Sequence, residues 1–162
     1  MKLLVFSDSH SAKSKMLRAV DIHKGKCDLI LFLGDGIRDL DPIKEKYPET
    51  PIFMVKGNCD YYDFEDVPKE SILDLDGIRV LVIHGDKHGV KYGYESIIRY
   101  ATEKEVDAVF FGHTHVPCDR IEYTEKGKIH LFNPGSIATE STFGVINTSN
   151  GVLVTNIAKI HW

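Results

Sequence analysis

Five short apolar runs are spread along the chain, and several of the intervals between them have helical periodicity. In the interval of residues 12–23, apolar side chains recur on one helical face, and the same holds for residues 94–101. Asp41-Pro42 has the pattern of a helix N-cap followed by proline, which predicts a short helix toward Tyr47. Strands that are apolar on both faces and joined through helices predict a mainly parallel sheet with covered faces. The five predicted strands are residues 3–6, 29–33, 52–55, 80–83 and 108–111.

Paired strand patterns around turn residues predict three β-hairpins. Asp76-Gly77 and Asn150-Gly151 are dipeptides typical of tight hairpin turns. Because two of the hairpins follow the last apolar run, we expect a second, antiparallel sheet packed on the first. No linker, repeat or low-complexity segment interrupts the pattern, which predicts one domain over residues 1–162. The predicted hairpins join residues 71–75 to 78–83, 120–123 to 129–132, and 143–147 to 152–160.

Composition and charge narrow the class of protein. Hydrophobic residues make up 43% of the chain, charged residues 27%, and the formal net charge is −4, which argues against a protein that coats nucleic acid or an anionic membrane. The apolar runs are too short to cross a bilayer, and the first ten residues, MKLLVFSDSH, lack the apolar core of a signal peptide. Cys27, Cys59 and Cys118 form no C-x-x-C pair. We therefore expect a cytoplasmic protein with no membrane partner. The sequence carries no strong signal for nucleic-acid binding.

Side chains that can bind a metal follow each of the five apolar runs directly. Since the carboxyl ends of parallel strands meet at one edge of a sheet, we expect these side chains to converge. Glycines at residues 34, 57, 85 and 112 stand beside them and allow sharp turns and close approach of the backbone. The converging side chains are Asp8, His10, Asp35, Asn58, His84, His113 and His115.

This set of donors predicts a pair of metal ions. Imidazoles and carboxylates gathered without a metal would be a costly group of desolvated polar side chains. Seven ligands are too many for one ion, but two ions that share a bridging carboxylate would each receive about four. Oxygen and imidazole donors without thiolate suit manganese, iron, zinc or nickel. His113 and His115 are then expected to face different ions of the pair.

The same residues, in this order, resemble the motifs of the calcineurin-like metallophosphoesterase superfamily. Its pattern is D-x-H, G-D, G-N, a histidine and G-H-x-H, which this chain matches between Asp8 and His115. The small size, the sequence GNCD and the segment of residues 133–136 make the chain similar to the compact YfcE-type phosphodiesterase branch. The resemblance implies an α/β fold, a four-layer αββα sandwich of two mixed sheets flanked by helices. It also implies a metal site at the C-terminal ends of the strands.

The resemblance further implies how the ligands are shared and what reaction follows. Asp35 would bridge two divalent ions, manganese being the expected metal and nickel, iron or zinc the alternatives. A bridging hydroxide would attack a phosphodiester, so the substrate is expected to be a small phosphodiester. The implied catalytic set is Asp35, Asn58, His84 and Cys59. The implied ligands are Asp8, His10, Asp35 and His115 for one ion, and Asp35, Asn58, His84 and His113 for the other.

Two positions depart from the family pattern. Many members have a histidine where this chain has Cys59, and that histidine assists the leaving group or contacts phosphate. A thiol is a poorer proton donor without positive charge, which predicts a preference for phosphodiesters, activated aryl ones above all, over alkyl monoesters. The alternative is that Cys59 is a small half-buried thiol without a catalytic part. The second departure is Asp86, where relatives often have a histidine.

Other readings stay open. The retromer subunit Vps29 resembles this branch and serves chiefly as a protein-binding scaffold, so a scaffold with little or no catalysis is the alternative function. The oligomeric state is undetermined, with a homodimer as one option. His23, His130 and His161 lie outside the motifs and are expected in surface or core-edge positions, whereas His88 could line the mouth of the cleft.

Overall fold

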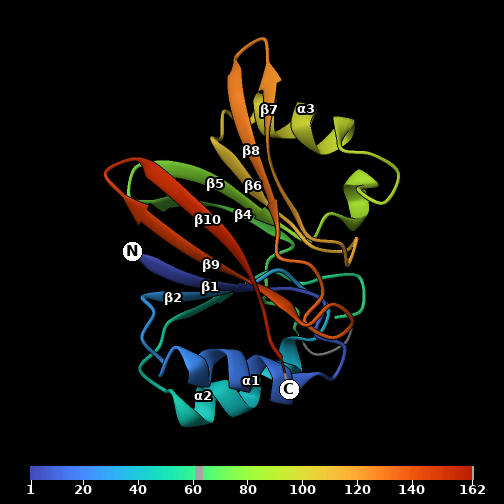
Figure 1. Cartoon of the computed structure of the whole chain (residues 1–162). Coiled ribbons are helices and arrows are strands. Elements are labelled where there is room, and N and C mark those ends of the chain that lie inside the picture. The colour runs from blue at the N-terminus through green and yellow to red at the C-terminus, as the bar shows by residue number, and fades with distance from the viewer. Residues whose placement is uncertain (61–63, 162) are drawn as a thin grey trace.

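The computed structural model describes residues 1–60 and 64–161, which form ten strands with helices on two sides (Figure 1). The strands are β1 (Lys2–Phe6), β2 (Leu29–Phe32), β3 (Ile52–Met54), β4 (Glu70–Leu75), β5 (Ile78–Ile83), β6 (Ala108–Phe110), β7 (Cys118–Thr124), β8 (Gly127–Asn133), β9 (Thr142–Ser149) and β10 (Val152–Lys159). The helices are α1 (Lys13–Ile22), α2 (Asp41–Lys46) and α3 (Glu95–Glu103), together with the short 3-10 helices η1 (Ile37–Leu40) and η2 (Asp86–His88).

The strands form two five-stranded mixed sheets. The first has the order β10-β9-β1-β2-β3, in which β1, β2 and β3 are parallel and β9 pairs antiparallel with both β1 and β10. Its register pairs Leu4 with Ile30 on one side and with Val145 on the other. The second sheet has the order β4-β5-β6-β8-β7, in which β5, β6 and β8 are parallel. All five apolar runs are therefore strands, as predicted.

The predicted division of the strands between the sheets is wrong. The five apolar runs do not share one parallel sheet, because β5 and β6 belong to the second sheet. The late hairpins do not form an antiparallel sheet of their own either: β9–β10 extends the first sheet and β7–β8 extends the second. Apolar runs show that a strand is buried on both faces, but they do not say which strand lies beside it. The mixed sheets agree with the architecture implied by the family resemblance.

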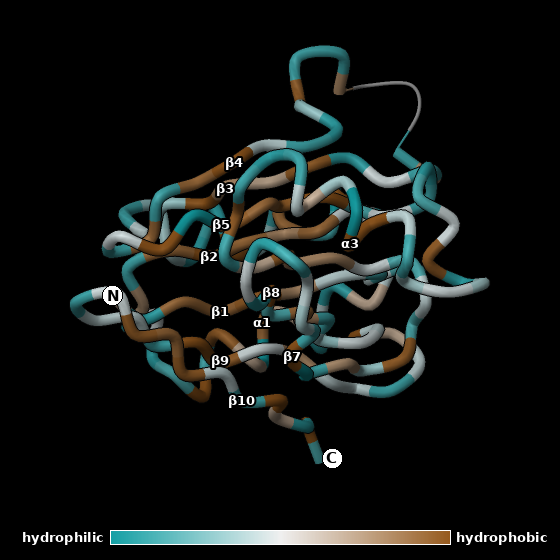
Figure 2. The backbone as a smooth tube through the Cα atoms, turned by 90° about the horizontal axis from the view of Figure 1, so that it is seen from above, coloured by the Kyte–Doolittle hydropathy of each residue, from teal (hydrophilic) through white to brown (hydrophobic). Residues whose placement is uncertain are grey.

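The layers follow from which faces are apolar. Val5 and Leu31 of the first sheet pack against Val80, Phe110 and Phe132 of the second in one core between the sheets. A second core lies between the first sheet and the helices α1 and α2, and a third lies between the second sheet and α3. In Figure 2 the hydrophobic colour follows the central strands. The order of layers is therefore αββα, as implied by the resemblance.

The helices lie where the periodicity predicts them. Met16, Ala19 and Val20 form the buried face of α1, and Ile97 and Ala101 that of α3. At α2 the prediction was off by one residue: Asp41 is the first helical residue rather than the N-cap, because η1 runs directly into the helix. Within the described residues, no helix has the length and apolar character needed to span a membrane.

Candidate metal centre

The seven predicted ligands lie together at one edge of the sandwich. Three of the segments that carry them follow β1, β2 and β3 in the first sheet, and two follow β5 and β6 in the second. The two sheets place the carboxyl ends of these strands at the same edge, so the ligands meet although the strands belong to different sheets. The convergence predicted from the sequence is therefore present, with a different sheet arrangement behind it.

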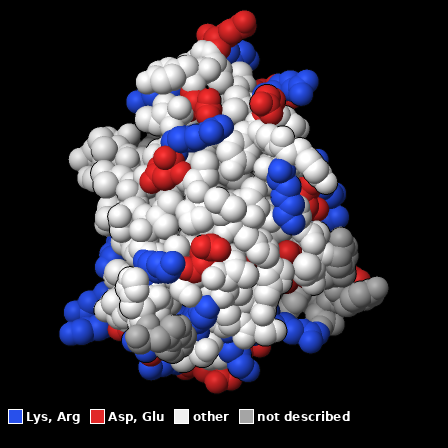
Figure 3. Space-filling model, turned by 45° about the vertical axis from the view of Figure 1, so that its right-hand side comes forward, with Lys and Arg blue, Asp and Glu red and all other residues white. Residues whose placement is uncertain are grey.

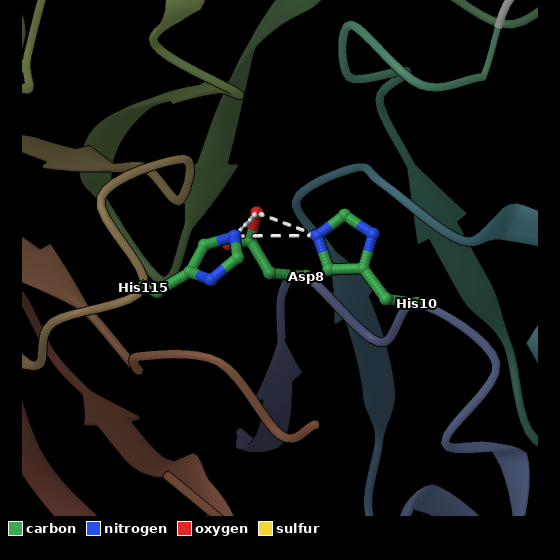
Figure 4. A group of neighbouring side chains, drawn as sticks. All are labelled: Asp8, His10 and His115. Atoms are coloured by element: carbon green, nitrogen blue, oxygen red, sulfur yellow. Dashed lines mark hydrogen bonds and ion pairs between the residues drawn. The ribbon is translucent and has the colours of Figure 1, made fainter. Parts of the chain in front are cut away.

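Asp8, His10 and His115 form the first group of donors (Figure 4). The two imidazole Nε2 atoms lie 3.2 Å apart, and the Nε2 of His115 lies 3.3 Å from Asp8 Oδ1. The Nε2 of His10 is 4.0 Å from the same oxygen. With metal–nitrogen bonds of about 2.0–2.1 Å in tetrahedral geometry, two nitrogen ligands of one ion lie about 3.3 Å apart. The spacing in this group therefore fits a shared cation.

Asp35, His84 and His113 form a second group, and Asn58 joins it. The Nε2 of His84 lies 3.4 Å from Asp35 Oδ2, 3.2 Å from Asn58 Oδ1 and 3.2 Å from the Nδ1 of His113. These four atoms surround one small volume. Asp35 Oδ2 also lies 3.9 Å from the Nε2 of His10, so this carboxylate stands between the two groups.

One buried oxygen in the site lacks a hydrogen-bond partner. The Asp8 side chain is fully buried, and its Oδ2 accepts from the Ser7 hydroxyl at 2.6 Å and from the His113 N–H at 3.0 Å. Its Oδ1 finds no hydrogen-bond donor among residues 1–60 and 64–161. A buried anionic oxygen without a partner is costly unless a cation meets it. The described residues therefore fit a divalent metal at this position.

The tautomer of His84 is set by the backbone. Its Nδ1 lies 2.7 Å from the carbonyl oxygen of Leu33, to which it can donate, and this leaves Nε2 free to face the second group of donors. Burial lowers the pKa of His84, but the carboxylates of Asp35 and Asp8 outweigh burial and raise it above its usual value. Burial and the neighbouring His84 lower the pKa of His113.

Asp35 is held ionised by its neighbours. Burial raises the pKa of its carboxyl group, but His84 and the Cys59 N–H, which donates to Oδ1 at 2.7 Å, bring that pKa well below its usual range. Asp35 therefore offers a charged oxygen, Oδ2, to the space between the two groups.

Asp60 holds the two loops that carry Asp35 and Asn58. Its Oδ2 accepts from the N–H groups of Asp35 at 2.7 Å and Gly57 at 2.9 Å. Its Oδ1 accepts from Gly36 at 2.9 Å and Ile37 at 3.1 Å. The sequence reading did not identify this role. The acidic residue two positions after Asn58 was the available signal, but nothing in the chain shows which backbone groups it meets.

Other residues that support the site were not predicted from the sequence either. Asp39 accepts from the Ser9 hydroxyl and the Ser11 N–H, both at 2.7 Å, and so holds the loop that carries His10. In the segment of residues 133–136, the side chain of Asn133 donates to the Gly112 carbonyl at 2.9 Å, and the hydroxyl of Ser136 donates to the Asp8 carbonyl at 2.8 Å. This segment therefore holds in place, from the buried side, the loops that carry Asp8 and His113.

The backbone of the site is strained. Asp8, His10, Asp35, His113 and His115 all have positive φ angles, of 52°, 37°, 64°, 65° and 65°. Such conformations are uncommon for residues other than glycine and cluster at functional sites, where the surrounding structure holds them in place.

Two glycines of the motifs are required for close approach rather than for a turn. A Cβ at residue 57 would overlap Asp35 Oδ1, and a Cβ at residue 112 would overlap the hydroxyl of Ser7. These positions keep room for the carboxylates of the site.

Cys59 lies at the rim of the site. Burial and the nearby Asp35 carboxylate raise the pKa of its thiol to about 11, so the thiol is protonated at neutral pH. Together with His10, Asp35 and Arg38 it lines a cavity of about 380 Å³. The structure thus places Cys59 beside the predicted metal ligands.

Three of the histidines outside the motifs lie away from the donor groups. His23 packs edge-on against Phe143, and the Nε2 of His130 lies 2.6 Å from Asp119 Oδ1. The carbonyl of His161 accepts from Arg18 near the C-terminus. His88 lines a small pocket together with Asn58, as the cleft-mouth prediction suggested.

The paired donor groups define a metal-binding protein of the α/β class. The family model of the calcineurin-like phosphoesterase superfamily domain matches residues 1–151, and the chain belongs to this superfamily. Over 139 residues it is 32% identical to the probable metallophosphoesterase YsnB of Bacillus subtilis, covering 85% of this chain and 75% of that protein.

Solved structures share the fold. A conserved uncharacterized protein of Streptococcus pneumoniae, described as a predicted phosphoesterase, aligns with a TM-score of 0.76 at 25% identity, over 98% of this chain and 88% of that chain. An archaeal phosphodiesterase aligns at 0.72 and 18% identity, over 98% and 100%. A single mutant of Vps29 from Entamoeba histolytica aligns at 0.72 and 16% identity, over 99% and 100%. The last two likenesses show the fold alone.

Proposed function

We propose that this protein is a phosphodiesterase whose active site holds two divalent metal ions. Asp8, His10 and His115 would hold one ion, Asn58, His84 and His113 the other, and Asp35 would bridge them. The observation that carries the proposal is the arrangement of seven donors in two adjacent groups, together with the buried Asp8 Oδ1, which has no hydrogen-bond partner among the described residues. Manganese is the proposed metal, with nickel, iron and zinc as alternatives.

The chain prepares this site in three ways. The Leu33 carbonyl orients His84 and the Cys59 N–H orients Asp35, and Asp60 holds together the loops that carry Asp35 and Asn58. Bound divalent ions would supply positive charge to the phosphate oxygens and lower the pKa of a nucleophilic water. Their charge would more than neutralise Asp8 and Asp35, so the site would attract a phosphate although the whole chain is acidic.

Phosphodiesters are the proposed substrates because of Cys59. A monoester carries a second negative charge and, when alkyl, a poor leaving group, and both call for a nearby cationic acid. The protonated thiol of Cys59 carries no positive charge to offer. An activated aryl diester needs neither form of help. The proposed reaction is therefore hydrolysis of a small phosphodiester. We also propose that the protein is cytoplasmic.

The charged side chains on the face drawn in Figure 3 give no indication of a nucleic-acid partner. On the face drawn in Figure 3, the Lys and Arg side chains of the described residues are interspersed with Asp and Glu. A basic stripe of the kind that tracks a phosphate backbone is not seen on that face.

The test is metal-dependent turnover. Protein stripped with a chelator is reloaded with each metal in turn and assayed on bis(4-nitrophenyl) phosphate and on 4-nitrophenyl phosphate. We expect activity only with metal, a diester-to-monoester ratio of kcat/KM above one, and loss of turnover in Asp35→Asn with the fold retained by circular dichroism. A ratio below one would contradict the proposed preference for diesters. Lack of turnover with every metal would contradict the proposal that the protein is an enzyme.

A scaffold of the Vps29 type is the second candidate. The observation that favours it is the similar fold of Vps29 together with apolar side chains exposed on β10, where Val152 and Val154 are 58% and 56% exposed. The complete donor set favours catalysis instead. If the metal-loaded protein turns over no phosphoester, the scaffold becomes the better account.

A further inference from the structure

A small basic pocket lies directly beside the candidate metal centre. It measures about 110 Å³, and Asn58 and Gly57 form the wall that it shares with the site. Three lysines line it, Lys56, Lys69 and Lys87. The cavity near His10 and Cys59 contains neither Asn58 nor these lysines among its described lining residues. A diester bound between the two cavities would have one substituent on each side.

The fold brings the lysines together from three segments. Lys56 lies two residues after the end of β3, and its N–H donates to the Pro68 carbonyl at 2.9 Å, which places it beside the segment of Lys69. Lys87 belongs to η2, after β5. Lys69 lies against Lys87, and this contact, more than any other, lowers the pKa of Lys69. Two ammonium groups held together repel each other, and an anion between them would remove the repulsion.

The acidic residues of the pocket do not fully balance this charge. Glu70 accepts a hydrogen bond of 2.5 Å from the hydroxyl of Tyr100 on α3, so one of its carboxylate oxygens already has a donor outside the pocket. Asp86 is the other carboxylate of the lining. The lining therefore has three lysines against two carboxylates, an excess of positive charge, whereas the chain as a whole is acidic. The Nζ of Lys56 donates to the Phe64 carbonyl at 2.9 Å, which leaves Lys69 and Lys87 as the main donors for an anion.

We propose that this pocket binds a second anionic group of the substrate, a phosphate carried on one substituent of the diester. The inference rests on the proposed phosphodiesterase function and names the substrate class: phosphodiesters with a further phosphate near the scissile one. Lysine ammonium groups are suited to this task because each acts as a point charge with several donors. The phosphate would lie beside Asn58 while the diester phosphorus lies at the metal centre.

The test uses two pairs of compounds that differ by one phosphate. Turnover is compared on thymidine 5′-(4-nitrophenyl phosphate) with and without a 3′-phosphate. Binding to the manganese-loaded protein is measured by calorimetry with thymidine 3′,5′-bisphosphate and thymidine 5′-phosphate. The variants are the double substitution Lys69→Gln/Lys87→Gln, the charge-retaining Lys69→Arg/Lys87→Arg, and Lys126→Gln at the exposed β7–β8 turn as a matched control.

We expect the wild type to favour the compound with the extra phosphate roughly tenfold in both KM and Kd, about the effect of one charge-assisted contact. The glutamine double variant should lose this preference, whereas the arginine variant and Lys126→Gln should retain it. Equal binding of both compounds by the wild type, or an unchanged preference in the glutamine variant, overturns the inference even if turnover is normal. If neither ester is hydrolysed but the binding preference follows the lysines, the phosphodiesterase proposal fails and the anion site stands.

Discussion

Asp60→Asn is the substitution that tests most sharply how the site is held together. The wild-type carboxylate is buried, with 6% of its surface exposed, and accepts four backbone N–H groups from two loops. Asparagine has nearly the same shape but only one acceptor oxygen. In either orientation of the amide, two of the four N–H groups would face its NH₂ group and lose their acceptor.

The expected cost follows from that count. A buried N–H without a partner costs about 1–3 kcal/mol, so two of them cost roughly 2–6 kcal/mol. Gly36 and Gly57 are only partly buried, and water can reach them once the loops separate, which favours the lower half of that range. Small domains have a free energy of unfolding of about 5–15 kcal/mol, so the variant should still fold. The damage should concentrate on the loops that carry Asp35 and Asn58.

Two measurements on the same protein separate this account from general destabilisation. Urea unfolding of the metal-free protein should show a loss of roughly 2–4 kcal/mol. Calorimetric titration with Mn²⁺ under native conditions should show affinity reduced at least tenfold, because Asp35 and Asn58 are no longer prepositioned. Asp66→Asn makes the same chemical change at an exposed residue a few positions further along and should alter neither quantity. Wild-type stability and wild-type manganese affinity in Asp60→Asn would refute the reasoning.

Three further predictions concern the same site. Gly57→Ala should greatly weaken metal binding while the far-ultraviolet circular dichroism stays native, since a Cβ there would overlap Asp35 Oδ1; a variant with normal metal content and turnover would contradict this. Manganese affinity should fall with decreasing pH, by up to about tenfold per unit below the raised pKa of His84, because a proton competes for Nε2; affinity that stays level between about pH 8 and pH 6 would be the opposite result. Cys59→His should raise the monoester-to-diester ratio of kcat/KM by bringing a cationic acid to the rim, and an unchanged ratio would support a thiol without a catalytic part.

The donors of the site could be predicted from the sequence because the pattern that marks them lies within a few residues of each one. Each donor directly follows an apolar run, and any arrangement in which the carboxyl ends of those strands share an edge brings them together. That is why Asp8 and His113 lie close together, as the sequence pattern predicts, although β1 and β6 belong to different sheets. The sheets themselves were not predictable in this way, since the hairpin β9–β10 could pair with any open strand edge. Only the three-dimensional register shows that it pairs with β1.

The supports of the site were harder to predict than its ligands. Asp60 and Asp39 act through hydrogen bonds to backbone N–H groups, and a backbone group leaves no mark in the sequence. The lysine pocket was missed for a related reason. Lys56, Lys69 and Lys87 are separated along the chain and form no charge run, so only the folded structure places them beside Asn58.

The proposed function requires two divalent cations side by side at the edge of the sandwich. The most direct measurement is anomalous diffraction at the manganese edge from crystals of the manganese-loaded protein. The account predicts two peaks per chain, one enclosed by Asp8, His10 and His115 and one by Asn58, His84 and His113, with Asp35 touching both. A single peak, or peaks remote from these side chains, would contradict it.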